Sequence, residues 1–519
     1  MTYPPLVRIY YGQGGIFLPK KLPIFYSALM LTGVNLLLRL VSTSFQVYIS
    51  GRIGAAGVGL LQLVMSVGSL ALTAGMAGVR TATMYLTAGE LGRKMPQKVC
   101  HVLSACFLYS ILFSSVVSTT LYVFAPFLAE YWIGNIHTVS AIRLFSFTLP
   151  VSCLCGVMTG YFTAANRIGT LAAVEVAEQL ISMLVTMTLL LLWAGHDPAK
   201  ACCGIIFGSC ISTCLTLTCL VVLRLREHAP TDAQFPVRSR LLETALPLAL
   251  ADNLRAGIST TENLMVPKRL ALYPAVADPL AAFGMVCGMV FPVVMFPAAI
   301  LFALAELLIP ELARCAAAQS QQRIRYLVKR SLKVAMLYGC LFSGLEFLLS
   351  RELCLWLYGS DAASRYLRLY ALLIPMLYCD CITDAMTKGL GQQKACVRYN
   401  IITSAMDVIF LFLLLPKYGM MGYFFSFFVT HLLNFVLSLR RLLKLVGKVL
   451  SPAIPTLTAA GTAGSIFIAA HIRHSALRGI SYVAVFASLI TLLQVVGKED
   501  VAWLCGLVRN QKNKSRLCH

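Results

Sequence analysis

The chain has 519 residues, of which 58% are hydrophobic and 12% are charged, and its formal net charge is +22. Soluble globular chains carry about 25% charged residues, whereas this chain has many separate apolar runs of about 20 residues, each long enough to cross a bilayer as a helix. The runs are continuous, which excludes an outer-membrane β-barrel. The basic residues form short clusters between the runs, which excludes a nucleic-acid-binding surface. The composition predicts an all-α polytopic membrane protein.

An N-terminal tail of residues 1–24, without the features of a signal peptide, precedes about fourteen predicted membrane helices. These are 25–49, 57–78, 99–125, 139–162, 170–194, 201–223, 241–265, 280–305, 329–350, 366–387, 397–415, 418–439, 453–472 and 478–497. We expect two lobes of six helices each, an interlobe linker, two additional helices and a basic cytoplasmic tail. Their ranges are 25–223 and 241–441 for the lobes, 224–240 for the linker, 442–497 for the additional helices and 498–519 for the tail.

The first predicted helix has its polar residues on one face. Asn35, Arg39, Ser42 and Gln46 are spaced i, i+4, i+7 and i+11, which is one narrow stripe at about 100° per residue. An arginine at that depth costs at least about 2.5–3.5 kcal/mol on insertion scales, so Arg39 should face protein or water. We expect a glycine-spaced turn over residues 51–59 to end this helix. The stripe predicts one wall of a hydrophilic path through the membrane.

Two segments resemble each other at an offset of about 225 residues. LPVSCLCGVMTGYFTAANR, from Leu149, and IPMLYCDCITDAMTKGLGQQK, from Ile374, each have an early proline and a polar turn near the end. The helix that follows has a polar face in both copies: Glu175, Glu178 and Ser182 in one, and Asn400, Ser404 and Asp407 in the other. The offset spans six predicted helices, so the lobes should share one topology, related by a pseudo-twofold axis along the membrane normal.

This repeat requires a polar face on the seventh predicted helix, the equivalent of the first. Asp252, Arg255, Ser259 and Glu262 provide it at i, i+3, i+7 and i+10. Arg39 and Arg255 each lie fourteen residues into their helices, which predicts a central cleft lined from both lobes. An internal salt bridge of Arg255 with Asp252 or Glu262 is the structural alternative, and Arg39 could likewise pair with a buried carboxylate.

Further acidic residues are candidates for ion coupling or gating. Asp380 and Asp384 lie one turn apart within the tenth predicted helix, where unpaired carboxylates are costly. Glu175, Glu178 and Asp407 are further candidates, although Glu175 and Glu178 also suit the N-terminal end of a helix. We expect no cofactor; coupling to H⁺, Na⁺ or the membrane potential stays open.

The loops differ in charge between the two sides. Of the 43 Lys and Arg residues, 30 lie on the side of the N-terminal tail, ten on the opposite side and three within predicted helices. The positive-inside rule then places both termini in the cytoplasm. Most of the 18 cysteines lie in apolar runs and are expected to be packing residues. No metal site, phosphate loop or Ser/His/Asp set is present in the sequence, so no catalytic residue is predicted.

The run SGRIGAAGVGLLQLVMSVGSLALTAGMAGV (Ser50–Val79) resembles the second-helix signature of the stage V sporulation protein B family of polysaccharide transporters. This family belongs to the multidrug/oligosaccharidyl-lipid/polysaccharide exporter superfamily. ENLMVPKRL (262–270) and GYFTAANR (160–167) resemble the same family, as does the two-lobe, MATE-like layout. The chain departs from the family pattern at Ala56, where the family has an acidic residue, and at Arg80, where it has proline. Met84-Tyr85 also replaces a lysine–leucine pair.

The resemblance implies a flippase of lipid-linked oligosaccharide or peptidoglycan-type precursors. It would work by alternating access in the bacterial inner membrane, in cell-envelope or spore formation. The substrate would be an anionic lipid-linked glycan and the protein a monomer. Arginine forks bind phosphate oxygens bidentately, which makes Arg39, Arg52 and Arg255 the candidates for the pyrophosphate. Asn35 and Gln46 are candidates for sugar hydroxyls, and Asp252 and Glu262 share the cleft.

Two other functions stay open. A MATE-type multidrug or cation antiporter would need a net acidic cleft, and the first and seventh helices offer two arginines against two carboxylates. A multi-helix glycan polymerase or ligase would need a large external loop with catalytic charges. The short outer loops argue against such an enzyme.

Overall fold

The computed structural model of the protein describes residues 24–92, 96–165, 167–194, 197–226, 237–447, 449 and 453–495. All regular elements in this part of the chain are helices, which confirms the predicted all-α membrane fold. Residues 1–23 of the N-terminal tail, 227–236 of the linker and the whole C-terminal tail from 498 lie outside the described residues.

Ten helical segments in the described chain are long and apolar enough to cross a membrane, or twelve if each of two bent helix pairs is one span. The expected count of fourteen is not confirmed. Two predicted helices, 25–49 and 57–78, correspond to two helices that meet at a kink at Gly54 within α1 (Ile24–Met76), and the count of ten takes them as parts of one segment, Leu36–Leu91. A third, 241–265, lies in α7 (Val237–Leu270), which is long enough to cross a membrane but is not among the ten.

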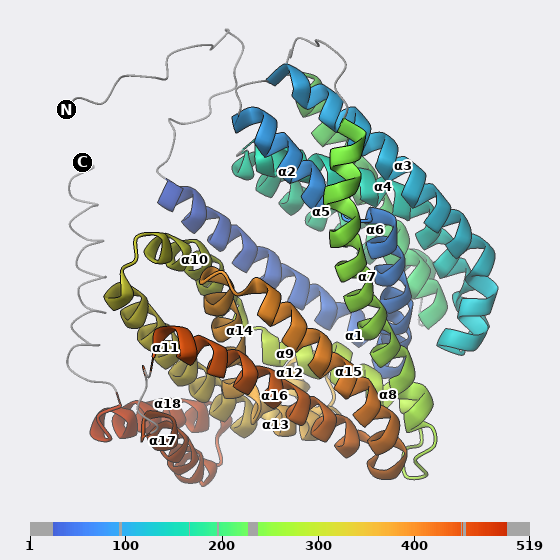
Figure 1. The fold of residues 1–519 in the computed structure, drawn as a ribbon. Helices are drawn as coiled ribbons and strands as arrows, with labels where there is room; N and C mark the ends of the chain where they lie inside the picture. The colour runs from blue at the N-terminus through green and yellow to red at the C-terminus, as the bar shows by residue number, and fades with distance from the viewer. Residues whose placement is uncertain are drawn as a thin grey trace, which may run out of the picture.

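One group of helices forms the blue-to-teal side of Figure 1. The helices α3 and α6 both pack on α4, and α5 packs on α6. The second part of α1 contacts this group. The members are α2 (Val79–Gly92), α3 (Pro96–Phe127), α4 (Val139–Ala164), α5 (Ile168–Leu189) and α6 (Pro198–Leu225), with the short turns η1 (Leu128–Ile133), η2 (Ile136–Thr138) and η3 (Leu190–Ala194).

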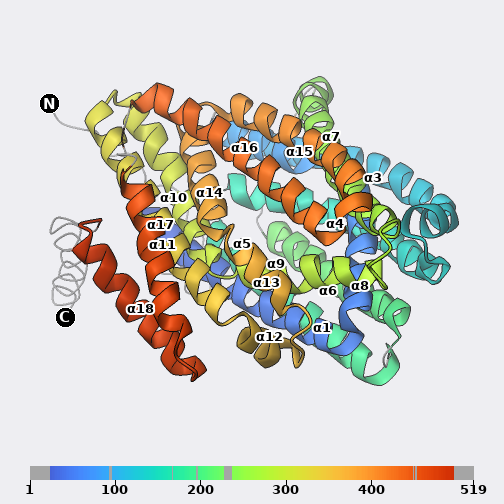
Figure 2. The same ribbon diagram turned by 90° about the horizontal axis from the view of Figure 1, so that it is seen from below.

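A second group forms the yellow-to-orange side, and α7 stands between the two groups in contact with α1 and α15 (Figure 1). The members are α8 (Pro279–Gly284), η4 (Met285–Val290), α9 (Phe291–Met295), α10 (Ala298–Ala317), α11 (Gln321–Leu348), α12 (Ser350–Tyr358), α13 (Ser364–Ala371), α14 (Ile374–Gly389), α15 (Gln393–Tyr418) and α16 (Met420–Val446). At the edge of this group, α17 (Ala453–Ala470) and α18 (Ser475–Leu492) pack on each other and on α11 (Figure 2).

The glycine-rich segment of α1 is helical except at one residue. Gly54, with φ 70° and ψ 177°, interrupts the helix, and the expected turn over residues 51–59 is therefore wrong in its extent. A Cβ atom at Gly59 would collide with the carbonyl oxygen of Leu280 on α8. Glycine at this position thus permits close helix packing rather than a turn, and the kink at Gly54 directs the first part of α1 toward the second helix group.

Candidate functional site

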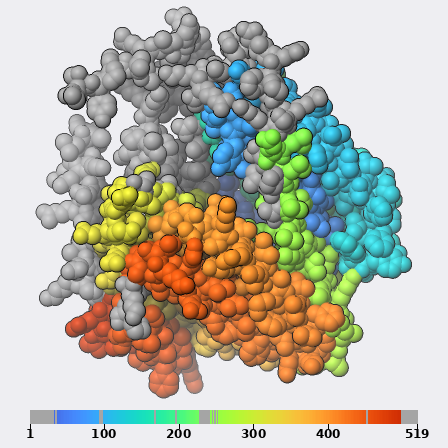
Figure 3. Space-filling view, viewed as in Figure 1, coloured from blue at the N-terminus to red at the C-terminus, as the bar shows by residue number. Residues whose placement is uncertain are grey.

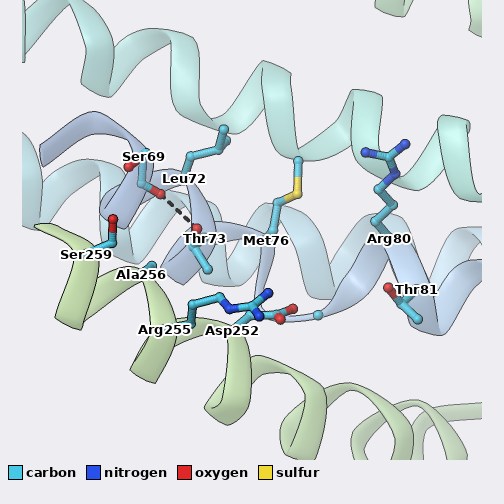
Figure 4. A pocket seen from close by; sticks show the side chains of 11 residues that line it. Ser69, Leu72, Thr73, Met76, Arg80, Thr81, Asp252, Arg255, Ala256 and Ser259 are labelled. Carbon is cyan, nitrogen blue, oxygen red and sulfur yellow. Dashed lines mark hydrogen bonds between the residues drawn. The ribbon is translucent and has the colours of Figure 1, made fainter. Parts of the chain in front are cut away.

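One polar cavity of about 450 Å³ lies where α1, α2 and α7 meet (Figure 4). Asp252, Arg255 and Ser259 of α7 line it, facing Ser69 and Thr73 of α1. Arg255 and Asp252 reach from α7 into the space beside the end of α1 (Figure 4). No ion pair of Arg255 is present among the described residues, so the expected alternative of a closed internal salt bridge with Asp252 or Glu262 is not formed.

Arg80 is a second cation on the wall of this cavity. Arg80 is the second residue of α2. Ala77 and Gly78, with positive φ angles of 41° and 72°, separate α2 from α1. The side chain points away from α7 (Figure 4), and Glu175 on α5 is close enough to interact with it electrostatically. The lining of the cavity thus includes two guanidinium groups and one carboxylate.

Arg39 lines a different polar cavity, of about 600 Å³, together with Ser42, Gln46 and Gln62 of α1. Phe302 and Glu306 of α10 lie on its other side. The guanidinium carbon of Arg39 is 4.4 Å from the centroid of the Phe302 ring, a geometry that stabilises a cation without neutralising it. Arg39 thus lies beside a polar space and an aromatic ring of α10; its separation from lipid stays a prediction.

The two cavities lie along one face of α1 and are separated by a hydrogen-bonded contact at Ser66. The Thr260 hydroxyl of α7 donates to the Ser66 carbonyl oxygen at 3.1 Å, and the Asn263 amide donates to the Ser66 hydroxyl at 3.0 Å. Gln62 precedes this contact and Ser69 follows it. The structure therefore places Arg39 and Arg255 on neighbouring cavities instead of one shared cleft. Figure 3 shows a recess between the two helix groups in which the blue residues of α1 are visible.

The remaining predicted substrate residues occupy different positions. Gln46 lines the Arg39 cavity and donates to the Gly288 carbonyl oxygen of η4 at 3.4 Å. Arg52 is not part of the lining of either cavity; its guanidinium carbon is 5.7 Å from the ring centroid of Tyr48 on the same helix. Asn35 belongs to α1, but its side chain lies outside the described structure.

Glu262 lies away from both cavities and close to Asp407. The two carboxylates, on α7 and α15, are near enough to interact electrostatically. Two hydroxyls of α16, those of Ser426 and Thr430, donate to Asp407 Oδ1 at 2.5 Å and 3.2 Å. Glu262, which we expected in the substrate cleft, therefore lies near Asp407, which we expected in ion coupling. Two carboxylates with nearby hydroxyls can bind a proton or a hard cation.

The other acidic candidates have nearby hydrogen-bond donors or cations. The amide of Asn434 on α16 donates to both oxygens of Asp380, at 3.3 Å and 3.2 Å. Asp384 and Lys388, one turn apart on α14, form an ion pair at 2.6 Å. On α5, Glu178 accepts a hydrogen bond of 3.0 Å from the Thr213 hydroxyl, and Glu175 lies near Arg80. Their roles in coupling or gating stay predictions.

Sequence analysis did not select Arg80 of the Arg255 cavity, Glu306 of the Arg39 cavity or Glu346, which lines a neighbouring groove. Arg80 lies outside the predicted helix 57–78 and is therefore expected in a loop. The polar stripe Gln62, Ser66, Ser69 and Thr73 repeats the spacing of the Arg39 stripe and could have identified the α1 wall of the Arg255 cavity.

Comparison with known proteins identifies the family. A family model described as MatE matches residues 32–193 and 271–413. The chain belongs to the MatE family. The matched ranges include Arg39, Arg80 and the acidic residues of α14 and α15, whereas most of α7 lies between them. This MatE chain is thus a multi-pass member of a transporter family.

The relatives of the MatE chain agree with the resemblance found in the sequence. It is 23% identical over 409 residues to "Stage V sporulation protein B" of Bacillus subtilis (strain 168), which covers 76% of this chain and 78% of that protein. The fold is similar to that of "Lipid II flippase MurJ", with a TM-score of 0.67, 11% identity and coverage of 91% and 100%. An inward-facing MATE multidrug resistance transporter has a TM-score of 0.62, 13% identity and coverage of 80% and 97%. These likenesses confirm the predicted MATE-like fold and superfamily.

Proposed function

We propose that this MatE-family chain is a flippase for lipid-linked glycan precursors with an anionic headgroup. The observation that carries the proposal is the Arg255 cavity, whose lining includes two arginines, Arg80 and Arg255, and one carboxylate, Asp252. Guanidinium groups bind phosphate oxygens through paired hydrogen bonds and stay charged in a low dielectric. Sporulation protein B, as a relative, and the flippase MurJ, as a structural neighbour, support a substrate of this class.

The positions of the carboxylates favour an anionic over a cationic substrate. The sequence predicts a cleft with two arginines, Arg39 and Arg255, and two carboxylates. Glu262 is counted with Asp252 because it shares a helical face with Arg255. In the structure Glu262 lies near Asp407, and Arg80 joins Arg255. Glu306 offsets Arg39 in the second cavity, so the two cavities together hold three arginines and two carboxylates.

A drug or cation antiporter is the second candidate, and one observation favours it. The carboxylates of Glu262 and Asp407 lie near each other where α7 packs on α15, and the MATE neighbours have a similar fold. We assign this pair to ion coupling, with H⁺ or Na⁺ as the coupling ion, rather than to the substrate. In this scheme alternating access moves the headgroup past α1 while the pair binds and releases the ion.

The proposal extends to the setting of the protein. The excess of Lys and Arg on the loops of the N-terminal side supports cytoplasmic termini, and the relative supports a bacterial inner membrane and a role in the cell envelope or in sporulation. We expect a monomer that transports its substrate without altering it chemically.

Reconstitution tests the proposal. Purified protein in proteoliposomes should translocate a fluorescent polyprenyl-pyrophosphate disaccharide, and Arg255→Ala should slow this about tenfold. Arg351→Ala is the matched control, because Arg351 is exposed and pairs with Asp361 at 3.3 Å away from the cavity. Ethidium transport at a rate unaffected by Arg255→Ala, without lipid translocation, would instead establish the antiporter.

A further inference from the structure

A carboxyl group without a hydrogen-bond or ion-pair partner among the described residues is buried beside a groove that adjoins the Arg39 cavity. Glu346 of α11 is 4% exposed. Its Oε2 atom is buried without a hydrogen bond, and no ion pair of Glu346 occurs in the described part of the chain. Burying an ionised carboxyl group without a hydrogen bond or a counter-charge is energetically costly.

Glu346 lines an apolar groove of about 510 Å³ between α1, α11 and α12. Figure 2 shows α1 running beside α12 in this region. Leu40 of α1 and Trp356 of α12, on the wall of the groove, are 42% and 82% exposed, so the groove reaches the apolar outer surface. Thr43 lines both the groove and the Arg39 cavity. The buried acid is therefore one helix away from a predicted substrate residue.

A tyrosine lies near both Glu346 and Arg39. Tyr378 of α14 is close enough to both side chains to interact with them electrostatically. Its hydroxyl donates to the Val294 carbonyl oxygen at 2.8 Å. Tyr338 of α11 donates to the Pro297 carbonyl oxygen at 2.9 Å. On the side of α13, Arg368 lies 5.8 Å from the ring of Phe347 and bonds to Ser350.

We propose that Glu346 is a proton-binding site whose charge is coupled to the Arg39 cavity. The carboxyl keeps its proton while the groove is closed to water. When α1 moves and water enters, the O–H bond breaks, the proton passes to water, and a carboxylate remains. This negative charge attracts Arg39 and weakens its hold on an anionic headgroup, which promotes release.

The groove favours a proton over a metal cation. A cation would need several oxygen ligands, but the groove lining is largely apolar. The Ser44 hydroxyl is bonded to the Leu40 carbonyl oxygen at 3.0 Å. The carbonyl oxygens of Val294 and Pro297 already accept hydrogen bonds from the two tyrosines. Few oxygens are left to surround an ion.

The role in release rests on the proposed flippase function, whereas the proton site can be tested without a substrate. Dicyclohexylcarbodiimide modifies protonated carboxyls in apolar surroundings, and peptide mass spectrometry locates the adduct. Wild-type protein in nanodiscs should be modified at Glu346 several-fold more at mildly acidic than at mildly alkaline pH. Glu311, which pairs with Arg323 at 2.6 Å on the surface, is the internal control and should stay unmodified.

Two results would overturn the proposal: no modification of Glu346 at any pH, or modification suppressed by Na⁺ at constant pH, which would indicate a cation site. In proteoliposomes, Glu346→Gln should weaken the stimulation of lipid translocation by a pH gradient, and Glu311→Gln should retain it in full. If Glu346 is modified in a pH-dependent way but no lipid is translocated, the proton site is supported and the flippase function is contradicted. If lipid is translocated but Glu346 is not modified at any pH, the flippase function is supported and the proton site is contradicted.

Discussion

Two regions of the molecule place charged side chains on helices of its membrane-embedded part, and they differ in how these charges are compensated. At α14 and α16, Asp384 pairs with Lys388 at 2.6 Å, and Asp380 accepts two hydrogen bonds from Asn434. At α1, α2 and α7, by contrast, Arg80 and Arg255 line a cavity without forming an ion pair within the described chain. Paired charges contribute to stability, whereas charges kept free beside a cavity are available to a ligand. We therefore expect substitutions of the cavity arginines to affect transport and substitutions of the paired residues of α14 to affect stability.

The largest effect is expected from removing both free cations of one cavity. A hydrogen bond to a charged group contributes about 1.5–3 kcal/mol, which corresponds to about tenfold to hundredfold in rate or affinity for each arginine. Arg80→Ala combined with Arg255→Ala should therefore lower lipid translocation about a hundredfold or more at low substrate concentration. Thermal unfolding should change little, since neither side chain forms an ion pair with another described residue.

Arg39→Ala should have the next largest effect, about tenfold on translocation. Phe302→Leu removes the ring 4.4 Å from the guanidinium and should cost about threefold, since such contacts contribute about 0.5–1 kcal/mol at partly exposed sites. Initial rates in proteoliposomes check both variants. A full rate in Arg39→Ala would show that the α1 stripe has only a structural role.

The paired region should respond in stability. Asp384→Asn leaves Lys388 half-buried without its partner. The side chains of Lys388 and Asp384 are 34% and 21% exposed, so the loss should be about 2 kcal/mol, below that of a fully buried pair. Asp384→Asn with Lys388→Met should recover part of it in denaturant or thermal unfolding. An altered ion dependence of transport at unchanged stability would instead support the predicted coupling role of Asp384.

The smallest effect on transport is expected at the kink of α1, which lines neither cavity. Gly54→Ala places a side chain at φ 70° and ψ 177°, a backbone region that is almost exclusive to glycine and costs about 1–3 kcal/mol, although no atom lies within 4 Å of the added Cβ. Gly51→Ala is the matched control, because it has the same open surroundings with ordinary helical backbone. Equal unfolding free energies for the two variants would show that the kink is not a strained feature.

Helical periodicity was sufficient to predict much of the fold. Continuous apolar runs predicted the helices, and the stripe containing Arg39 predicted which face of α1 is polar. The glycine run misled the prediction, because Gly59 serves close packing against α8 and only Gly54 leaves the helical conformation. Sequence alone does not distinguish these uses of glycine, since the partner helix lies more than two hundred residues away.

The sites were less predictable for the same reason. Glu262 shares a face with Arg255 on one helix, but its partner Asp407 comes from α15. Glu346 stands alone in an apolar segment, so no periodic pattern marks it. Arg80 is visible in the sequence as a departure from the family proline, yet its position beside Arg255 depends on the contact between α2 and α7.

The most direct test of the central claim compares two lipids in the same vesicles. One bears a pyrophosphate-linked disaccharide, and the other bears the same disaccharide through a neutral linker. A cationic cavity predicts that the anionic lipid is translocated about tenfold faster or more and that Arg80→Ala with Arg255→Ala removes this preference. Equal rates for the two lipids in the wild-type protein would contradict the claim that these arginines select the headgroup.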